Sequence, residues 1–280
     1  MPDRQLNDFK TDKLSSDKNV MLKICGLTQQ FKGVLAVDHI DMELSPGKIY
    51  GLIGTNGAGK STVVNMISGN LLPTAGEIIF NGKNVERLNA AQRAKSGIAR
   101  TFQNLRLFGD QSVLANVITA SQITRSYNLF EMLTYMPRYR KEEKLFEERA
   151  QEALKTMGIE QYADMQADNL AYGLQRRLEI ARCLAIDPKL LLLDEPAAGM
   201  NPQESFQLVE DIRGIHKNHP DMTILLIEHD MKVVMNLCEY IYVMASGKMI
   251  AQGTPEQIYE SEEVISAYLG GSVRRKSKRS

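Results

Sequence analysis

Alternating apolar and polar residues mark the chain after residue 20. Residues 22–24 and 40–44 alternate in this way, a period that is typical of strands with one buried face. Residues 77–80 have the same character and are followed by Asn81-Gly82, a pair that favours a tight hairpin turn. The pattern predicts an antiparallel sheet with one exposed face in the N-terminal part of the chain.

Unbroken apolar runs form a second pattern. Residues 49–53, 190–193 and 223–227 are almost entirely apolar, as expected for strands of a parallel sheet that is covered on both faces. A helix is predicted after the first run, and another between the last two from the spacing of Phe206, Val209, Ile212 and Ile215. The chain is therefore predicted to have an α/β fold with a parallel core sheet.

Helical periodicity dominates residues 85–170, which we expect to form a helical insertion. One stripe in this segment comprises Phe146, Ala150, Ala153, Leu154 and Met157, and Gly158 follows it as the expected cap. The stretch 127–139 is also rich in apolar residues but is too short to span a bilayer. We favour a core role for this stretch, and contact with a partner protein remains open.

Composition adds few constraints. Hydrophobic residues make up 43% of the 280 residues, and 34 basic residues balance 34 acidic ones, so nothing points to nucleic acid. Three scattered cysteines fit reduced structural thiols. No apolar run is long enough to cross a bilayer, and we expect a cytosolic chain that is able to dock on a membrane protein. Residues 1–20 are expected to be a flexible tail, and residues 271–280 a basic tail.

The strongest chemical motif is GTNGAGKS, which begins at the end of the first apolar run. Its glycines let the backbone turn tightly and direct N–H groups inward, while Lys60 can reach the terminal phosphates of a nucleotide and Ser61 can ligate magnesium. The loop lies between a predicted strand and a predicted helix, so the phosphates would meet a helix N-terminus. The expected phosphate cradle comprises Gly54, Thr55, Asn56, Gly57, Ala58, Gly59, Lys60, Ser61 and Thr62.

Two acids, Asp194 and Glu195, follow the run of four leucines. A phosphate-loop enzyme needs a carboxylate at a strand end to hold magnesium, and we assign this role to Asp194. Successive side chains of a strand point to opposite faces, so Glu195 can act as general base on the attacking water.

Together with further motifs, these residues resemble the ATP-binding cassette (ABC) family over residues 21–270. GTNGAGKS is similar to its Walker A motif and LLLLDEP to its Walker B motif. Gln103 in ARTFQN resembles the Q-loop glutamine, His229 in IEHD the switch histidine, and Phe31 the aromatic residue that stacks on adenine. The resemblance implies a phosphate-loop core with an antiparallel β subdomain and an inserted helical subdomain, and it implies ATP and Mg²⁺ as ligands. The implied metal ligands are Ser61, Gln103 and Asp194, and the implied catalytic residues are Glu195, His229 and Gln103.

The family's signature maps onto LAYGL, residues 170–174, with departures. Ala171 stands in place of the usual serine, Tyr172 in place of the first of two glycines, and Leu174 in place of the usual glutamine, whereas Gly173 is kept. Gly173 still opens a predicted helix whose amides can meet phosphate across a dimer interface. The missing serine hydroxyl predicts that the chain alone is mostly monomeric and hydrolyses ATP slowly.

These departures resemble one branch of the family. The phrases NLAYG, QRRLEIAR, DEPAAGMNP and GTPEQI are similar to the ATPase subunit of high-affinity branched-chain amino-acid importers. The resemblance implies a second ATPase subunit in a head-to-tail dimer, transmembrane permease subunits and an external solute-binding protein. It also implies a peripheral position on the cytoplasmic face of the inner membrane.

Three other functions remain open. Within the same family, the alternative is an ATPase that drives export of lipopolysaccharide or another lipid. Alternatives from other classes are a soluble phosphate-loop GTPase switch and a DNA-repair ATPase. No Asn-Lys dipeptide occurs in the chain, so the usual guanine-reading element is missing. Neither a long coiled coil nor a positive net charge supports DNA repair.

Overall fold

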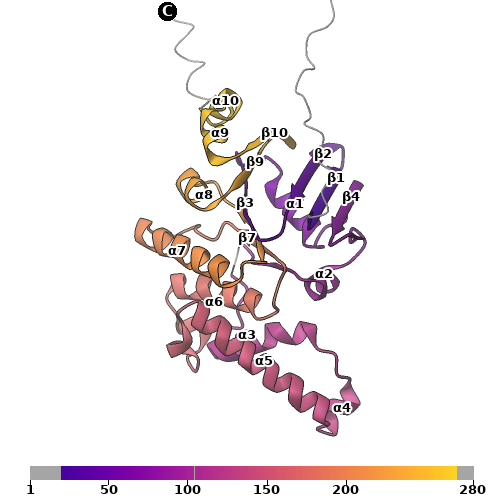
Figure 1. Ribbon diagram of the computed structural model, residues 1–280, viewed down its shortest axis with the longest axis vertical. Helices are drawn as coiled ribbons and strands as arrows, with labels where there is room; N and C mark the ends of the chain where they lie inside the picture. Colours follow the sequence, from indigo (N-terminus) through magenta and orange to yellow (C-terminus); the bar gives the residue numbers. More distant parts are fainter. Residues whose placement is uncertain (1–19, 104, 270–280) are drawn as a thin grey trace, which may run out of the picture.

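The computed structural model describes residues 20–103 and 105–269. The predicted tails, 1–20 and 271–280, lie outside these residues except for Val20. The described chain forms two sheets with helices packed around them, and a helical arm extends away from both (Figure 1).

The larger sheet has the strand order β10-β9-β3-β8-β7-β6, and all neighbours are parallel except β10 with β9. The central strands β3, β8 and β7 are buried along their whole length, which explains their unbroken apolar sequence. The prediction of an α/β fold with a parallel core sheet is confirmed. The strand bounds are β3 Ile49–Gly54, β6 Ile98–Arg100, β7 Leu190–Asp194, β8 Thr223–Ile227, β9 Tyr240–Ala245 and β10 Lys248–Gly253.

The smaller sheet is antiparallel, with the order β2-β1-β4-β5. The predicted antiparallel sheet is confirmed, and its last hairpin turns at Asn81-Gly82 as expected. Helix α1 (Lys60–Ile67) packs against β2 of this sheet and against β3 and β7 of the larger one. The strand bounds are β1 Leu22–Phe31, β2 Val34–Leu44, β4 Ala75–Phe80 and β5 Lys83–Asn84.

The helical arm connects β6 to β7. The predicted stripe from Phe146 to Met157 is buried on the long helix α5 and its C-cap, Met157, and Gly158 after it has a left-handed φ of 62°. The expected insertion, residues 85–170, begins too early, because it includes α2 (Ala90–Ser96) and β6, and β6 pairs with β7 in the core sheet. The arm contains α3 Val113–Ser121, α4 Leu129–Leu133, α5 Pro137–Thr156 and α6 Tyr172–Leu184, with 3-10 turns at Gln122–Thr124, Glu160–Tyr162 and Ala167–Asn169.

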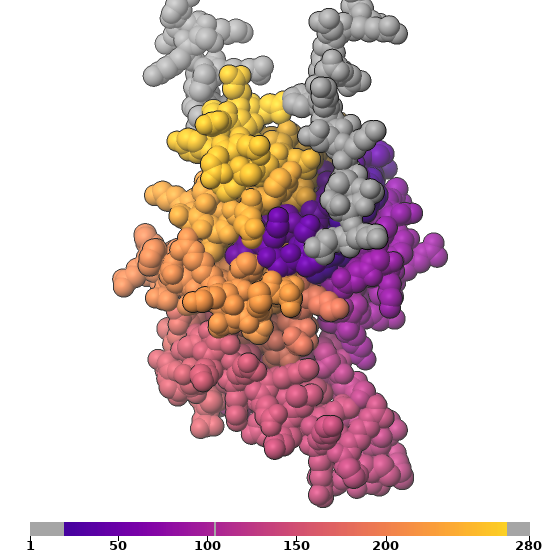
Figure 2. Space-filling view, viewed as in Figure 1, coloured from indigo at the N-terminus to yellow at the C-terminus, as the bar shows by residue number. Residues whose placement is uncertain are grey.

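The core role favoured for residues 127–139 is wrong for most of their apolar side chains. Leu129, Phe130, Leu133 and Tyr135 are 63 to 68% exposed, at the far end of the arm (Figures 1 and 2). Helix α4 is five residues long and packs on α5. The face of α4 toward α5 is therefore covered, and its other faces are open to solvent.

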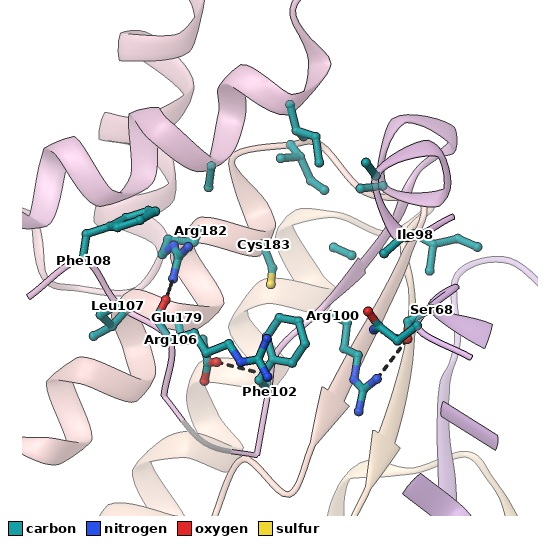
Figure 3. A pocket seen from close by; sticks show the side chains of 18 residues that line it. Ser68, Ile98, Arg100, Phe102, Arg106, Leu107, Phe108, Glu179, Arg182 and Cys183 are labelled. Atoms are coloured by element: carbon teal, nitrogen blue, oxygen red, sulfur yellow. Dashed lines mark hydrogen bonds between the residues drawn. The ribbon is translucent and has the colours of Figure 1, made fainter. Parts of the chain in front are cut away.

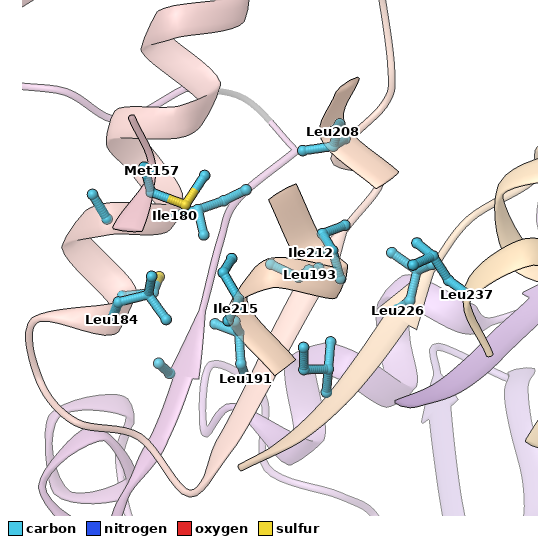
Figure 4. Close-up of a cluster of buried hydrophobic side chains, with 14 of the residues drawn as sticks. Met157, Ile180, Leu184, Leu191, Leu193, Leu208, Ile212, Ile215, Leu226 and Leu237 are labelled. Carbon is cyan, nitrogen blue, oxygen red and sulfur yellow. The ribbon is translucent and has the colours of Figure 1, made fainter. Parts of the chain in front are cut away.

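The core sheet carries a separate hydrophobic cluster on each face. Leu191 and Leu193 contribute to a cluster with α5, α6 and α7 (Figure 4), whereas Leu190 and Leu192 contribute to the cluster beneath the antiparallel sheet. Because the side chains of successive strand residues point to opposite faces, one run of leucines packs into both hydrophobic clusters. Phe206, expected with the buried residues of α7, is instead 66% exposed. The remaining helices are α7 Pro202–Asn218, α8 Met231–Leu237, α9 Pro255–Glu260 and α10 Glu262–Leu269.

The three cysteines, Cys25, Cys183 and Cys238, are free. Burial raises the pKa of Cys183 and of Cys238 to about 12. Both thiols are therefore protonated and unreactive at neutral pH, in agreement with the predicted structural role.

Candidate nucleotide site

The phosphate loop leaves the carboxyl end of β3 and runs into α1. Gly57 and Gly59 have φ angles of 78° and 100°, in the left-handed region that glycine adopts without strain. A Cβ at Gly59 would lie 2.6 Å from the carbonyl oxygen of Ala36, so the loop passes close to β2. Helix α1 has Gly59 as its N-cap, and no side chain caps its first amides. These amides are therefore available to an anion such as phosphate.

Lys60 is held inside the curve of this loop. Its Nζ donates to the carbonyl oxygens of Gly54 at 2.7 Å and Thr55 at 3.2 Å, and the residue is 6% exposed. Burial is the main cause that lowers the pKa of Lys60, and the nearby Glu195 and Asp194 oppose it. A phosphate oxygen would be a stronger acceptor than either neutral carbonyl. The ammonium group of Lys60 could therefore exchange these carbonyl partners for the phosphates of a bound nucleotide.

Asp194 lies at the end of β7 with one carboxylate oxygen engaged. Arg100 of β6 donates from Nη2 to Oδ2 at 2.7 Å, and its Nη1 donates to Asn65 at 2.6 Å and Ser68 at 2.9 Å. Within the described residues, Oδ1 of Asp194 takes part in no hydrogen bond with the protein. Sequence reasoning missed Arg100, which precedes the ARTFQN glutamine by three residues.

The residues present fit a magnesium ion. Oδ1 of Asp194 and the exposed hydroxyl of Ser61 are hard oxygen donors, which Mg²⁺ prefers together with phosphate oxygens and water. In the part of the chain that the structure describes, no cluster of three or more His, Cys, Asp or Glu side chains could hold a metal. A metal bound here would therefore depend on the nucleotide for further ligands.

Gln103 and Glu195 are brought together. Nε2 of Gln103 donates to Oε2 of Glu195 at 3.1 Å. Glu195 has a φ of 47°, a left-handed conformation that is uncommon for a residue with a long side chain and costs free energy. The conformation is fixed by the amide of Glu195, which donates to the carbonyl oxygen of Ile227 at 2.9 Å.

His229 does not join this pair in the described contacts. Its side chain is 57% exposed, and its Nδ1 lies 3.8 Å from Oε2 of Glu228. Glu228 is the buried member: its Oε1 accepts a hydrogen bond of 2.9 Å from the amide of Ala197, and burial raises its pKa. Sequence reasoning missed Glu228, although a carboxylate directly after a buried strand was a usable signal.

Outside the phosphate loop, Phe31 and Ala171 are exposed, and Gly173 is half-buried. Phe31 ends β1 and is 45% exposed, which leaves room for a base to stack on the ring. Ala171 is the exposed N-cap of α6 and has no side-chain hydrogen bond to the helix, and Gly173 lies in the first turn. Arg176, one turn further, was also missed, and its Nη2 donates to the carbonyl oxygen of Gln103 at 2.7 Å.

Known proteins share this sequence and this fold. Residues 37–198 match the family model described as ABC transporter, and residues 248–274 match the model described as branched-chain amino acid ATP-binding cassette transporter. LivG of Escherichia coli strain K12, a high-affinity branched-chain amino acid transport ATP-binding protein, is 46% identical over 89% of this chain and 98% of its own. BraF of Pseudomonas aeruginosa, named for the same role, is 41% identical over the same shares. A crystal structure of an ATP-binding cassette of an ABC transporter in its ADP conformation matches with a TM-score of 0.77 and 28% identity, over 90% of this chain and 99% of that one.

The chain belongs to the ABC transporter family and is an ATP-binding cassette. Within the family, it is similar to ATP-binding subunits that are named for branched-chain amino-acid transport. The family and the fold class predicted from the sequence are confirmed. The roles of the individual site residues remain predictions.

Proposed function

We propose that this chain is the ATP-hydrolysing subunit of an ABC importer for branched-chain amino acids. The observation that carries this assignment is the 46% identity to LivG of Escherichia coli across 89% of the chain. The match of residues 248–274 to the branched-chain amino acid model supports it independently of the ATP site. Leucine, isoleucine and valine are the expected cargo, which the other subunits of the importer would recognise.

We assign residues of this chain to each part of ATP hydrolysis. The loop amides and Lys60 bind the phosphates, and Phe31 stacks on adenine. Glu195 accepts the proton of the attacking water, and Gln103 orients Glu195 through the hydrogen bond of 3.1 Å. Ser61, Asp194 and Gln103 would hold magnesium, which would supply positive charge against the phosphates. His229 keeps its predicted role as switch histidine.

The complete site requires a second subunit. Ala171 and Gly173 lie at the exposed start of α6, and a head-to-tail dimer would place them over the ATP of the partner. ATP then favours the closed dimer, and hydrolysis allows it to open.

A cavity between the helical arm and β6 is the docking site that we propose for a permease subunit. Its volume is about 570 Å³, and Phe102, Leu107 and Phe108 line it (Figure 3). Phe102 directly precedes Gln103, whose side chain is hydrogen-bonded to Glu195. A permease segment in the cavity would therefore contact the loop that carries Gln103. No helix in residues 20–103 and 105–269 is long and apolar enough to span a bilayer. We therefore propose peripheral attachment through the permease, on the cytoplasmic face of the membrane, with a solute-binding protein on the other side.

Reconstitution in vesicles with permease subunits and a solute-binding protein tests the function. ATP should drive leucine uptake, and Glu195→Gln should retain ATP binding while slowing hydrolysis by about 10²- to 10⁴-fold, the range for loss of a general base. Turnover of Glu195→Gln within a few-fold of the unsubstituted chain would contradict the assignment of the base. Lipid movement without leucine uptake would favour the exporter instead.

Coupling has its own variant. Gln103→Ala should lower leucine uptake more than basal ATP hydrolysis, because Gln103 lies between the cavity and Glu195. Equal losses would reduce Gln103 to a magnesium ligand.

A further inference from the structure

Tyr172 links the signature to the loop that follows Glu195. Its hydroxyl donates to the carbonyl oxygen of Ala198 at 3.1 Å and accepts hydrogen bonds from Nε and Nη2 of Arg176 at 3.1 and 2.9 Å. Tyr172 and Arg176 are four residues apart on α6, so they lie on one face of the helix. A glycine at position 172, which the family signature usually has, could make none of these bonds.

Arg176 continues the connection to the loop that carries Gln103. It donates to the carbonyl oxygens of Phe102 at 3.0 Å and Gln103 at 2.7 Å, and to Oε2 of Glu179 at 3.2 Å. With the two bonds to Tyr172, these contacts occupy all the N–H donors of the guanidinium group. Oε1 of Glu179 accepts from the amide of Phe102 at 2.9 Å. Arg176 is 4% exposed, so this bonding holds it in one orientation.

The hydrogen bonds close a ring around Glu195. The side chain of Gln103 donates to the carboxylate of Glu195. The carbonyl oxygen of Gln103 accepts a hydrogen bond from Arg176. Tyr172 connects Arg176 to Ala198, whose amide donates back to the carbonyl oxygen of Glu195 at 3.1 Å. A displacement of the first turn of α6 therefore acts on Glu195 from two sides.

We propose that Tyr172 and Arg176 are positioning residues that transmit contact at the signature to the hydrolytic carboxylate of the same chain. The inference rests on the proposed function, in which the signature meets ATP on a second subunit. Tyr172 is 42% exposed beside Ala171, whereas Arg176 is buried. The pair therefore leads from the dimer surface to the interior, and it connects the two ATP sites of a dimer through the protein.

Hydrogen exchange of the nucleotide-free chain tests the ring directly. Tyr172→Phe removes the hydroxyl and keeps the aromatic ring, and we expect the amides of Phe102 and Ala198 to exchange about 3- to 10-fold faster, the effect of losing one net hydrogen bond. Arg176→Lys should have the same effect, because an ammonium group lacks the planar fork.

Two matched controls separate this effect from general loosening of the arm. Tyr127→Phe removes a hydroxyl that donates to Glu143 at 2.7 Å in the same arm, and Arg177→Lys changes the neighbouring arginine, which pairs with Asp211. Both controls should leave the exchange of Phe102 and Ala198 unchanged. Unchanged exchange in Tyr172→Phe and Arg176→Lys, or equal acceleration in the controls, would overturn the proposal.

Kinetics with ATP test transmission. Tyr172→Phe should lower kcat about 10-fold with KM for ATP nearly unchanged, the pattern expected when a group acts in the transition state and not in ground-state binding. The double variant of Tyr172 and Arg176 should lose no more kcat than either single variant, because each substitution alone already breaks the same hydrogen-bonded ring. Additive losses or a raised KM alone would overturn transmission. Absence of hydrolysis in the complete importer assembled with the unsubstituted chain would contradict the proposed function instead, and the exchange experiment, which needs no nucleotide, would still decide the link.

Discussion

Arg100 and Asp194 form a buried ion pair across the edge of the core sheet, with 2.7 Å between Nη2 and Oδ2 and side chains that are 9% and 4% exposed. Arg100 also lines the cavity beside the helical arm and bonds to Ser68 (Figure 3). The carboxylate assigned to magnesium thus has a fixed protein cation as its neighbour. One residue borders both the nucleotide site and the proposed permease site.

Replacing Arg100 should show how much this cation matters. Arg100→Met leaves a buried carboxylate without compensation, and we expect the free energy of unfolding to fall by about 3 to 5 kcal/mol. Arg100→Lys keeps the charge and should lose less. Urea unfolding with and without Mg²⁺ and ATP checks this, because a metal bound to Asp194 should recover part of the loss in Arg100→Met. Equal stability of the two variants in the absence of nucleotide would contradict the pairing.

Lys60→Ala should weaken ATP binding itself. A hydrogen bond to a charged group contributes about 1.5 to 3 kcal/mol, so we expect affinity to fall about 10- to 100-fold. Titration calorimetry with ATP measures this, and Lys48→Ala, an exposed lysine before β3, is the control. Unchanged affinity in Lys60→Ala would count against the phosphate loop.

Glu228 should make stability depend on pH. Burial raises its pKa above the ordinary value of 4.5, so the folded state binds its proton more tightly than the unfolded state does. The contribution of this group is therefore fully present below pH 4.5 and is lost as the pH rises through the folded pKa. Glu228→Gln should remove that loss, and its stability relative to the unsubstituted chain should increase from pH 5 to pH 8. Urea unfolding at both pH values tests this, with the exposed Glu147 changed to Gln as control. A constant difference between the two pH values would show that Glu228 does not titrate in this range.

Ala171→Ser should act in two separable ways. Because Ala171 is an N-cap without a side-chain bond, serine should stabilise the free chain by about 0.5 to 2 kcal/mol. Its hydroxyl should also strengthen ATP-dependent self-association, most clearly in the Glu195→Gln background. Thermal unfolding without nucleotide measures the first effect, and sedimentation with Mg²⁺ and ATP measures the second. If the unsubstituted chain already forms a tight homodimer that Ala171→Ser leaves unchanged, the signature does not set the choice of partner.

Local pattern was sufficient for the buried strands β3, β7 and β8 and for the phosphate loop. The run 190–193 is apolar at every position because both faces of β7 are covered, and a short run of this kind is typical of a strand inside a parallel sheet. GTNGAGKS is recognisable because its glycines serve the backbone of a single turn. Both features are determined by neighbours in the sequence.

The connections within the site depend on the order of the strands, which the sequence does not display. Arg100 meets Asp194 because β6 pairs with β7, and Glu228 meets Ala197 because β8 lies on the other side of β7. The exposure of Leu129 and Phe130 could not be predicted from the sequence either, because their apolar character does not reveal whether another element covers them. Tertiary placement decides these features, and single-sequence periodicity carries no signal for it.

The exposed ring of Phe31 gives the molecule an optical use. The whole chain contains no tryptophan, so Phe31→Trp would introduce a single indole at the end of β1, where it is open to solvent. Stacking of adenine on this indole would quench its emission. Nucleotide arrival could then be followed in real time by intrinsic fluorescence, without a dye and without background from any other tryptophan.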